Sequence, residues 1–196
     1  MKKIFTFVTF LIIIFSNINK VYSIEADVFV QSTVNRASAA LNNKFSKEEK
    51  IEKLKEIASE TVDIDGIGRY TLGSYKKDMT DSQMIEYKFL FRQYFLKSFS
   101  SRLAEYSNPE IEVTSKKKLN KNYTMVSSIL VSTDQRPEVK IKWRVSTKNP
   151  DNPLIMNLII EGLSLARTQK EEFSSIILSN DGNVNALFAS LKEFIK

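Results

Sequence analysis

The sequence predicts an α+β fold, in which helices enclose a four-stranded antiparallel sheet. Apolar residues recur at helical spacing between residues 24 and 106. The spacing changes to alternation between residues 110 and 161, where turn residues separate four short segments. Helical spacing then returns from residue 162 to the C-terminus. The order of helices, strands and helices is typical of a single α+β domain.

Residues 1–23 have the features of a secretory signal peptide. Lys2 and Lys3 precede an apolar run, and Val21 and Ser23 supply the small residues of a cleavage site after Ser23. The apolar run is shorter than the roughly 20 residues that a spanning helix needs, although an uncleaved anchor is the alternative. Cleavage leaves residues 24–196, which are long enough for one domain with its own core.

The composition excludes several classes of function. The formal net charge is +6, and it falls to about +3 when the three lysines of the signal are removed. This net charge is only mildly positive, and the sequence has no stripe of arginines and aromatic residues. We therefore expect no nucleic-acid partner. The chain has no His and no Cys, which excludes a Ser-His triad and zinc sites built on these residues. We therefore expect neither a metal nor a cofactor, and a fold that is stable without disulfides.

The first helices are predicted over residues 24–41 and 46–61. Ser46 and Glu49 have the spacing of a capping box. The next segment, residues 63–75, opens with Asp63 and Asp65, either of which can cap a short helix. A nucleotide-binding loop is disfavoured here, because this segment follows a helix rather than a strand. Three of the five glycines in the chain lie in this segment: Gly66, Gly68 and Gly73. We expect them to let neighbouring helices approach each other closely.

Residues 79–106 are predicted to form a single long helix of about 40 Å. The segment has no Gly and no Pro, and Thr80 and Gln83 form a second capping box. A helix on the surface of a core needs an apolar stripe of only about 100°. Here the apolar residues cover more than half of the circumference, so the helix is either deep in the core or lines a cavity with one side. These residues are Phe89, Leu90, Phe91, Tyr94, Phe95, Leu96 and Phe99.

Four strands are predicted over residues 110–118, 123–133, 139–145 and 154–161, and the short connections imply an antiparallel meander. The third strand alternates most clearly, with Lys140, Lys142 and Arg144 on one side. Together with the lysine run 116–118, these cations predict a basic face. It is either a solvated surface or a docking face for an acidic partner or anionic headgroups. Two helices, residues 162–178 and 181–195, close the chain.

Three segments, in their order and spacing, resemble a known family. They are residues 62–75, with the sequence VDIDGIGRYTLGSY; FRQY at residues 91–94 with SRLAEYS at 101–107; and EGLSL at 161–165 with EFSSII at 172–177. This set is similar to the MlaC (toluene-tolerance, Ttg2D-like) family. The resemblance covers most of the chain after the signal and is weakest before Val62. Two positions depart from the family pattern, because Pro153 stands near a usual Trp and Asn157 replaces an Asp.

The resemblance implies a soluble periplasmic protein of Gram-negative bacteria that carries a phospholipid between the outer membrane and an inner-membrane ABC transporter. The expected partners are the phospholipid itself, the MCE-domain subunit of that transporter and an outer-membrane lipoprotein complex. This transport maintains the lipid asymmetry of the outer membrane. The implied fold is a curved, NTF2-like sheet wrapped by helices around an internal apolar cavity, in which the acyl tails lie.

Periodicity suggests which residues would line such a cavity. Each buried methylene contributes about 0.8 kcal/mol, so two acyl tails need a dry apolar wall. Aromatic rings and flexible thioethers adapt to irregular tails. We expect the long helix to face the concave sheet across the lipid, although an ordinary core role is the alternative at each position. The predicted lipid-binding residues are Phe91, Phe95, Phe99, Met125, Ile129, Ile141, Trp143 and Leu158.

Two other functions are compatible with the sequence. The first is a periplasmic adaptor that binds no lipid and has a filled core. The second is an enzyme that uses a carboxylate beside an apolar pocket, as some NTF2-like folds do. Asp63 and Asp65 are the closely paired acids near glycines, but helix capping explains them better. We therefore expect no enzymatic activity.

Overall fold

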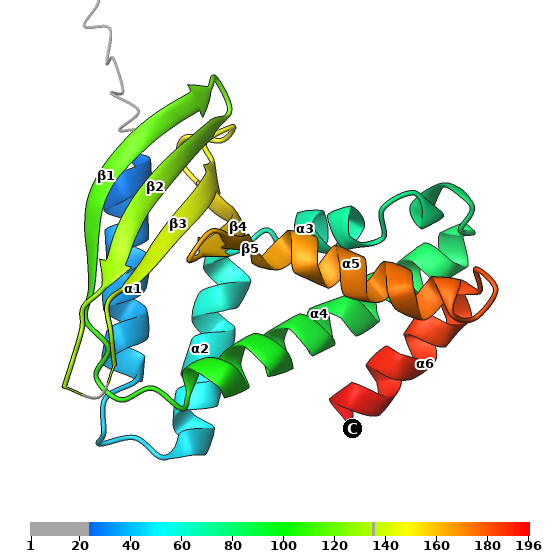
Figure 1. Ribbon diagram of the computed structural model, residues 1–196, viewed down its shortest axis with the longest axis horizontal. Helices are drawn as coiled ribbons and strands as arrows, with labels where there is room; N and C mark the ends of the chain where they lie inside the picture. Colours follow the sequence, from blue (N-terminus) through cyan, green and yellow to red (C-terminus); the bar gives the residue numbers. More distant parts are fainter. Residues whose placement is uncertain (1–23, 135) are drawn as a thin grey trace, which may run out of the picture.

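The computed structural model describes residues 24–134 and 136–196, which form six α-helices, one short 3₁₀ helix and five β-strands (Figure 1). The α+β class predicted from the sequence is confirmed. The predicted signal peptide, residues 1–23, lies outside the described residues.

The first three helices begin where the capping residues predict. The α1 helix (Ala26–Ala40) is followed by α2 (Lys47–Thr61), and Ser46 and Glu49 form the expected capping box before α2. The Glu49 carboxylate accepts from the Ser46 amide at 2.8 Å. Helix α3 (Ile64–Thr71) is capped by Asp63, whose carboxylate accepts from the Gly66 amide at 2.9 Å.

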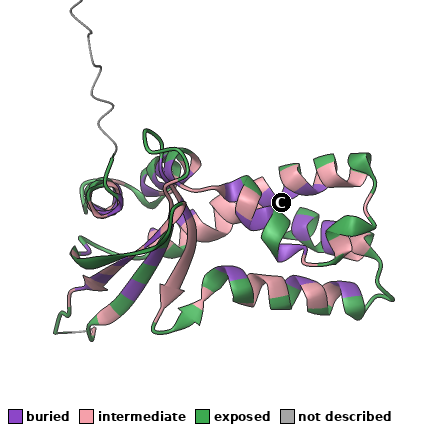
Figure 2. Ribbon diagram, turned by 90° about the horizontal axis from the view of Figure 1, so that it is seen from above, coloured by how far each residue is buried: buried purple, intermediate pink, exposed green. Residues whose placement is uncertain are grey.

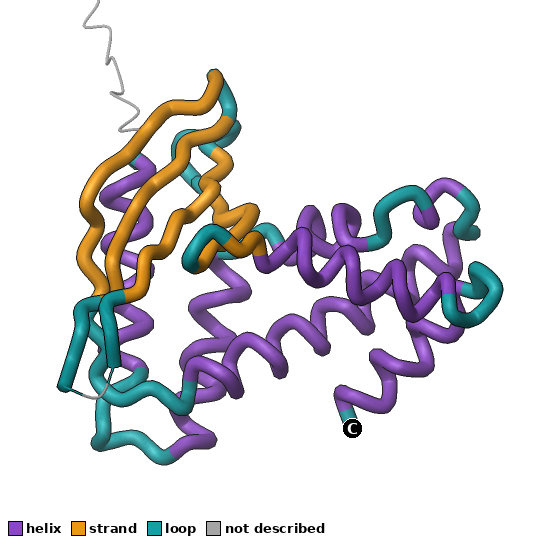
Figure 3. Tube along the Cα trace, in the orientation of Figure 1, coloured by secondary structure: helices purple, strands orange, loops and turns teal. Residues whose placement is uncertain are grey.

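The long helix is α4 (Asp81–Leu103), and it follows a short 3₁₀ turn, η1 (Tyr75–Lys77). Thr80 and Gln83 form the predicted capping box, but the helix is shorter at both ends than the predicted span of residues 79–106. It packs against α2, α3 and α6 (Val184–Ile195). Figure 3 shows that it reaches from the helical end of the molecule to the end that contains the sheet.

The sheet is a curved antiparallel meander of five strands rather than the four predicted. They are β1 (Ile111–Asn120), β2 (Tyr123–Leu130), β3 (Val139–Ser146), β4 (Leu154–Ile160) and β5 (Leu163–Ser164), in that spatial order. The additional strand has two residues, too few to show a periodicity. A tight turn returns it onto β4, with φ of 49° at Glu161 and 85° at Gly162. Positive φ at both central residues is typical of the turns that join two-residue hairpins.

The register defines two faces of the sheet. On the first, which we call the α1 face, Val126 lies opposite Trp143, and Trp143 lies opposite Leu158. Helix α1 covers this face with Val30 and Val34. On the other, which we call the open face, Met125 lies opposite Arg144, and Arg144 lies opposite Asn157.

The buried apolar residues form three clusters instead of one. The helical cluster joins α3, α4, α6 and α5 (Leu165–Leu178), and the sheet cluster joins α1 to the α1 face. A small corner cluster joins the end of α1 to α2 and to the end of α4. Figure 2 shows buried residues both in the sheet and in the helices beyond it. The molecule therefore has two main cores that meet at a boundary.

Candidate functional site

Phe91 lies in the helical cluster and does not face the sheet, contrary to the sequence-based hypothesis. It is only 2% exposed, and its ring meets Phe173 edge-on with centroids 6.1 Å apart. A Cβ placed on Gly68 of α3 would lie 2.7 Å from Phe91 Cδ1. The glycine thus lets α3 approach α4 closely, and Phe91 fills the contact between these helices.

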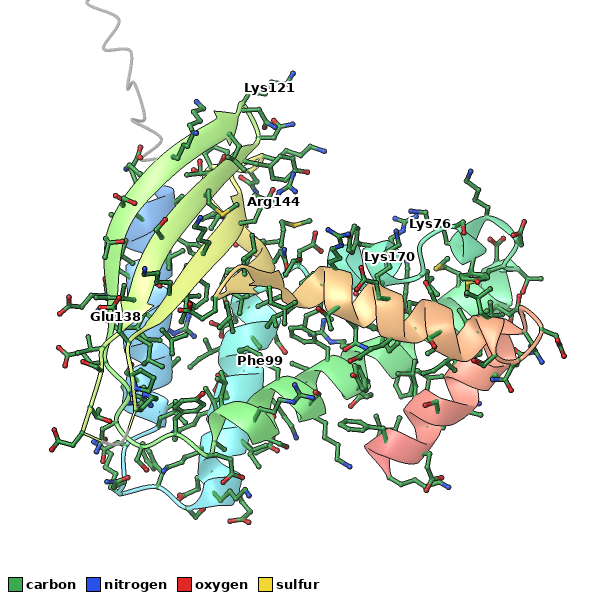
Figure 4. All side chains as sticks on the ribbon, viewed as in Figure 1. Lys76, Phe99, Lys121, Glu138, Arg144 and Lys170 are labelled. Atoms are coloured by element: carbon green, nitrogen blue, oxygen red, sulfur yellow. The ribbon has the colours of Figure 1, made fainter. Side chains whose placement is uncertain are left out.

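Phe95 packs against the helical cluster beside Phe91, with ring centroids 6.1 Å apart, and Phe99 follows it one turn further along α4. The rings of Phe95 and Phe99 stack, with centroids 5.6 Å apart and an interplanar angle of 8°, and both are half-buried. An α-helix turns by about 100° per residue, so Phe95 and Phe99 lie about 40° and 80° around the helix from Phe91. Leu103, which packs in the corner cluster with α2, lies further around in the same sense. Figure 4 shows Phe99 beside α2, close to where α2 leads into α3.

The connection between α2 and α3 lies at the boundary between the two main cores. The chain crosses from α2 to α3 through Val62, which pairs with Ile155 of β4. The amide of the next residue, Asp63, donates to the Ile155 carbonyl at 3.0 Å. Val62 itself packs against both the helical cluster and the sheet cluster. We call this boundary the joint.

The five predicted strand residues lie on both faces of the sheet and so do not share one wall, and their contact with lipid stays a prediction. Ile141, Trp143 and Leu158 lie on the α1 face, whereas Met125 and Ile129 lie on the open face. Strand β2 is apolar on both faces, so its alternation does not decide which side is buried. A shift by one residue exchanges the faces, and the structure buries the polar Thr124 and Ser128 of β2. Trp143 Nε1 donates to Ser128 Oγ at 2.8 Å, which satisfies both groups.

Four half-buried apolar residues on the elements that flank the joint are candidates for contact with an apolar ligand. They are Phe95 and Phe99 of α4, with Leu158 and Ile160 of β4, the strand that Val62 joins. Ile160 is absent from the lipid-binding residues predicted from the sequence. It follows Leu158 by two residues and therefore lies on the same face of the strand. Ile141 and Trp143 form the buried layer next to them. We call these four the joint residues.

The joint provides apolar surface rather than catalytic groups. None of its four residues is titratable, and Asp63 is occupied as the cap of α3. Within residues 24–134 and 136–196, no three His, Cys, Asp or Glu side chains gather to hold a metal ion. The helices of this same region are too short or too polar to span a bilayer. The side chains of these four residues can contact hydrocarbon.

Comparisons with known proteins identify a family and a similar fold. The profile of the family described as "MlaC protein" matches residues 31–193. The fold is also similar to a solved structure of the phospholipid-binding protein from Ralstonia solanacearum in complex with a phospholipid. The TM-score is 0.73 at 18% identity, and the match covers 88% of this chain and 97% of the other. No curated protein sequence matches this chain.

Proposed function

Because the chain belongs to the MlaC family, we propose that it is a soluble periplasmic carrier of phospholipids. It would move lipid between the outer membrane and an inner-membrane ABC transporter, and so maintain the asymmetry of the outer membrane. Its protein partners would be the MCE-domain subunit of the transporter and an outer-membrane lipoprotein complex. The bound phospholipid is the cargo and not a cofactor.

The observation that carries the proposal is the apolar joint in a fold whose solved relative is described with a bound phospholipid. Phe95 and Phe99 stack on each other and are half-buried, as Leu158 and Ile160 are on β4. Apolar side chains in such positions lose less contact with water than they would in a continuous core. Acyl chains that pack against these side chains would remove their remaining apolar surface from water. Each Å² removed in this way stabilises the complex by about 25 cal/mol.

The proposed mechanism follows from the chemistry of a diacyl lipid. Its tails do not cross water unaided, because each exposed methylene costs about 0.8 kcal/mol. The joint would hold the tails between α4 and β4 and leave the headgroup in water. The contacts there are apolar and have no fixed direction. The affinity for the lipid is then set by the shape of the site, and a moderate affinity permits transfer of the lipid to the next protein. A site of this kind accepts tails of different lengths, because rings adapt to irregular surfaces.

The two faces of the sheet supply a matched experiment. We predict that Leu158→Trp, which enlarges a joint residue, reduces the phospholipid that co-purifies with the protein several-fold. Ile129→Trp enlarges a half-buried residue of the open face, and we expect it to leave the bound phospholipid unchanged. Mass spectrometry of an organic extract measures the lipid, and circular dichroism verifies that both variants fold.

The comparison of the two variants decides where the lipid lies. Equal lipid in the Leu158→Trp variant and in the wild type would show that the joint is not the tail site. A loss confined to Ile129→Trp would place the tails on the open face. A folded wild-type protein that holds no lipid would instead favour the non-lipid adaptor.

A further inference from the structure

A cleft of about 330 Å³ opens on the open face, where the sheet meets α3 and α5. Its volume is at the lower end of the range for small-molecule sites, roughly 300 to 1,000 Å³. It lies on the opposite face of β4 from Leu158, so it is separate from the joint. The cleft is lined by Gly66, Ile67, Tyr70, Tyr123, Arg144, Met156, Asn157, Ser164, Ala166 and Arg167.

Arg144 contributes a positive charge that pairs with no carboxylate in the described part of the chain. Its partner across the β3–β4 register is Asn157, a neutral amide. The Asn157 side chain is already occupied, since its Nδ2 donates to Ser164 Oγ at 2.8 Å and its Oδ1 accepts from the Ala166 amide at 3.1 Å. None of the ion pairs among the described residues includes Arg144. The Arg144 guanidinium lies 4.8 Å from the ring centre of Tyr123, and this cation–π contact holds the guanidinium at the cleft.

Arg167 brings a second guanidinium to the same cleft. Its Nε donates to Glu171 at 3.0 Å, and both side chains of this pair are largely exposed. An exposed pair four residues apart on a helix contributes only about 0.3–0.5 kcal/mol, so a ligand can compete with Glu171. The bond to Glu171 uses Nε alone, which leaves the two terminal nitrogens of Arg167 for another acceptor.

A third cation lies beside this cleft. Lys170 Nζ is 5.6 Å from the ring centre of Tyr70, and Tyr70 lines both this cleft and a neighbouring one of about 640 Å³. Figure 4 shows Arg144 on the sheet and Lys170 on α5, on either side of the junction between them. Three cations therefore surround the junction, and the carboxylate of Glu171 lines the neighbouring cleft.

We propose that this cleft binds a phosphate group. Planar guanidinium groups donate in pairs to phosphate oxygens, and two arginines suit an anion with several acceptor oxygens. Ile67, Met156 and Ala166 line the same cleft and suit the carbon skeleton of a phosphate ester. Such a group can come from free phosphate or from the headgroup of an anionic phospholipid at a membrane surface. This site goes beyond the carriage of acyl tails, because the joint lies on the other face of β4.

Two probes test the phosphate site in the secreted protein. The first is inorganic phosphate, with binding followed through the NMR shifts of backbone amides that line the cleft. The second is co-sedimentation with phosphatidylcholine vesicles, with and without phosphatidylglycerol. We expect Arg144→Gln and Arg167→Gln each to weaken binding about tenfold, which is the effect of losing one charge-assisted contact. Lys44→Gln removes an exposed cation from the α1–α2 connection, and we expect it to leave binding unchanged.

Each outcome has a defined meaning. Saturable phosphate binding that weakens in the arginine variants alone supports a site for free phosphate. Sedimentation that depends on phosphatidylglycerol and on Arg144, without binding of free phosphate, supports a headgroup site. The proposal is overturned if neither probe binds, or if Lys44→Gln weakens binding as much as Arg144→Gln does. Co-purified lipid, measured in the same variants, reports on the joint separately and should not change.

Discussion

At the scale of single residues, Tyr87 shows how burial and hydrogen bonding oppose each other. The side chain is 1% exposed in the helical cluster. Its hydroxyl donates to the Gly68 carbonyl at 3.1 Å and lies 2.8 Å from Thr71 Oγ1. Burial raises the pKa of Tyr87 above its ordinary value of 10.0, and the hydrogen bond with Thr71 lowers it by less. The folded protein therefore retains this proton at a pH where an exposed tyrosine loses it.

We predict that the protein loses stability in alkali partly through Tyr87. Above about pH 10 the unfolded chain releases the tyrosine proton while the folded chain keeps it, so the free energy of unfolding falls as the pH rises. The Tyr87→Phe variant should show a shallower fall, although it loses about 1 kcal/mol at neutral pH with the hydrogen bond. Urea unfolding at a series of pH values measures both effects.

A matched variant isolates the effect of burial. Tyr106→Phe removes the hydroxyl of an exposed tyrosine and serves as the control variant. Burial also raises the pKa of Tyr94, and this residue contributes equally to the pH dependence of stability in both variants. Identical pH dependence in Tyr87→Phe and in the wild type would show that Tyr87 is not protected from ionisation.

At the scale of elements, the contact between α3 and α4 depends on Gly68. A methyl group there would lie 2.7 Å from Phe91 Cδ1, and Phe91 is held by the rings of Tyr87 and Phe173. We predict that Gly68→Ala destabilises the protein by about 1–3 kcal/mol, the typical cost of overpacking a core. This cost should exceed the gain in helix propensity of Ala over Gly, which is at most about 1 kcal/mol.

A double variant tests whether the clash is with Phe91. Adding Phe91→Leu should cost less in the Gly68→Ala background than in the wild type, because the smaller side chain relieves the overlap. The free energy of unfolding in urea gives the coupling between the two positions. Strict additivity, or a more stable Gly68→Ala protein, would contradict the close contact.

The same elements show what the sequence could and could not predict. The helices and the first four strands were predicted because their periodicity is long and their caps are explicit, as at Ser46 and Thr80. Helix α4 is apolar around most of its circumference, so its pattern did not separate Phe91 from Phe95. Strand β2 is apolar on both faces, so its pattern did not show that Ile129 lies away from Trp143. Both distinctions depend on tertiary packing, which a local pattern does not contain.

At the scale of the whole molecule, the buried apolar residues are divided among three clusters rather than gathered in one core. The sheet cluster and the helical cluster are each buried on their own, and the chain connects them at Val62. Phe95 packs against the helical cluster, and Leu158 and Ile160 pack against the sheet cluster, on the two sides of the joint. A phospholipid held there would contact both cores, and any ligand that binds the folded state alone also raises its stability.

Native mass spectrometry of the protein, purified from the periplasm without detergent, tests whether hydrocarbon occupies the joint. We expect a folded protein whose mass exceeds that of the polypeptide by one or more phospholipids, which are released when the protein unfolds. A folded protein with the mass of the polypeptide alone, which also takes up no phospholipid from vesicles, would contradict this expectation.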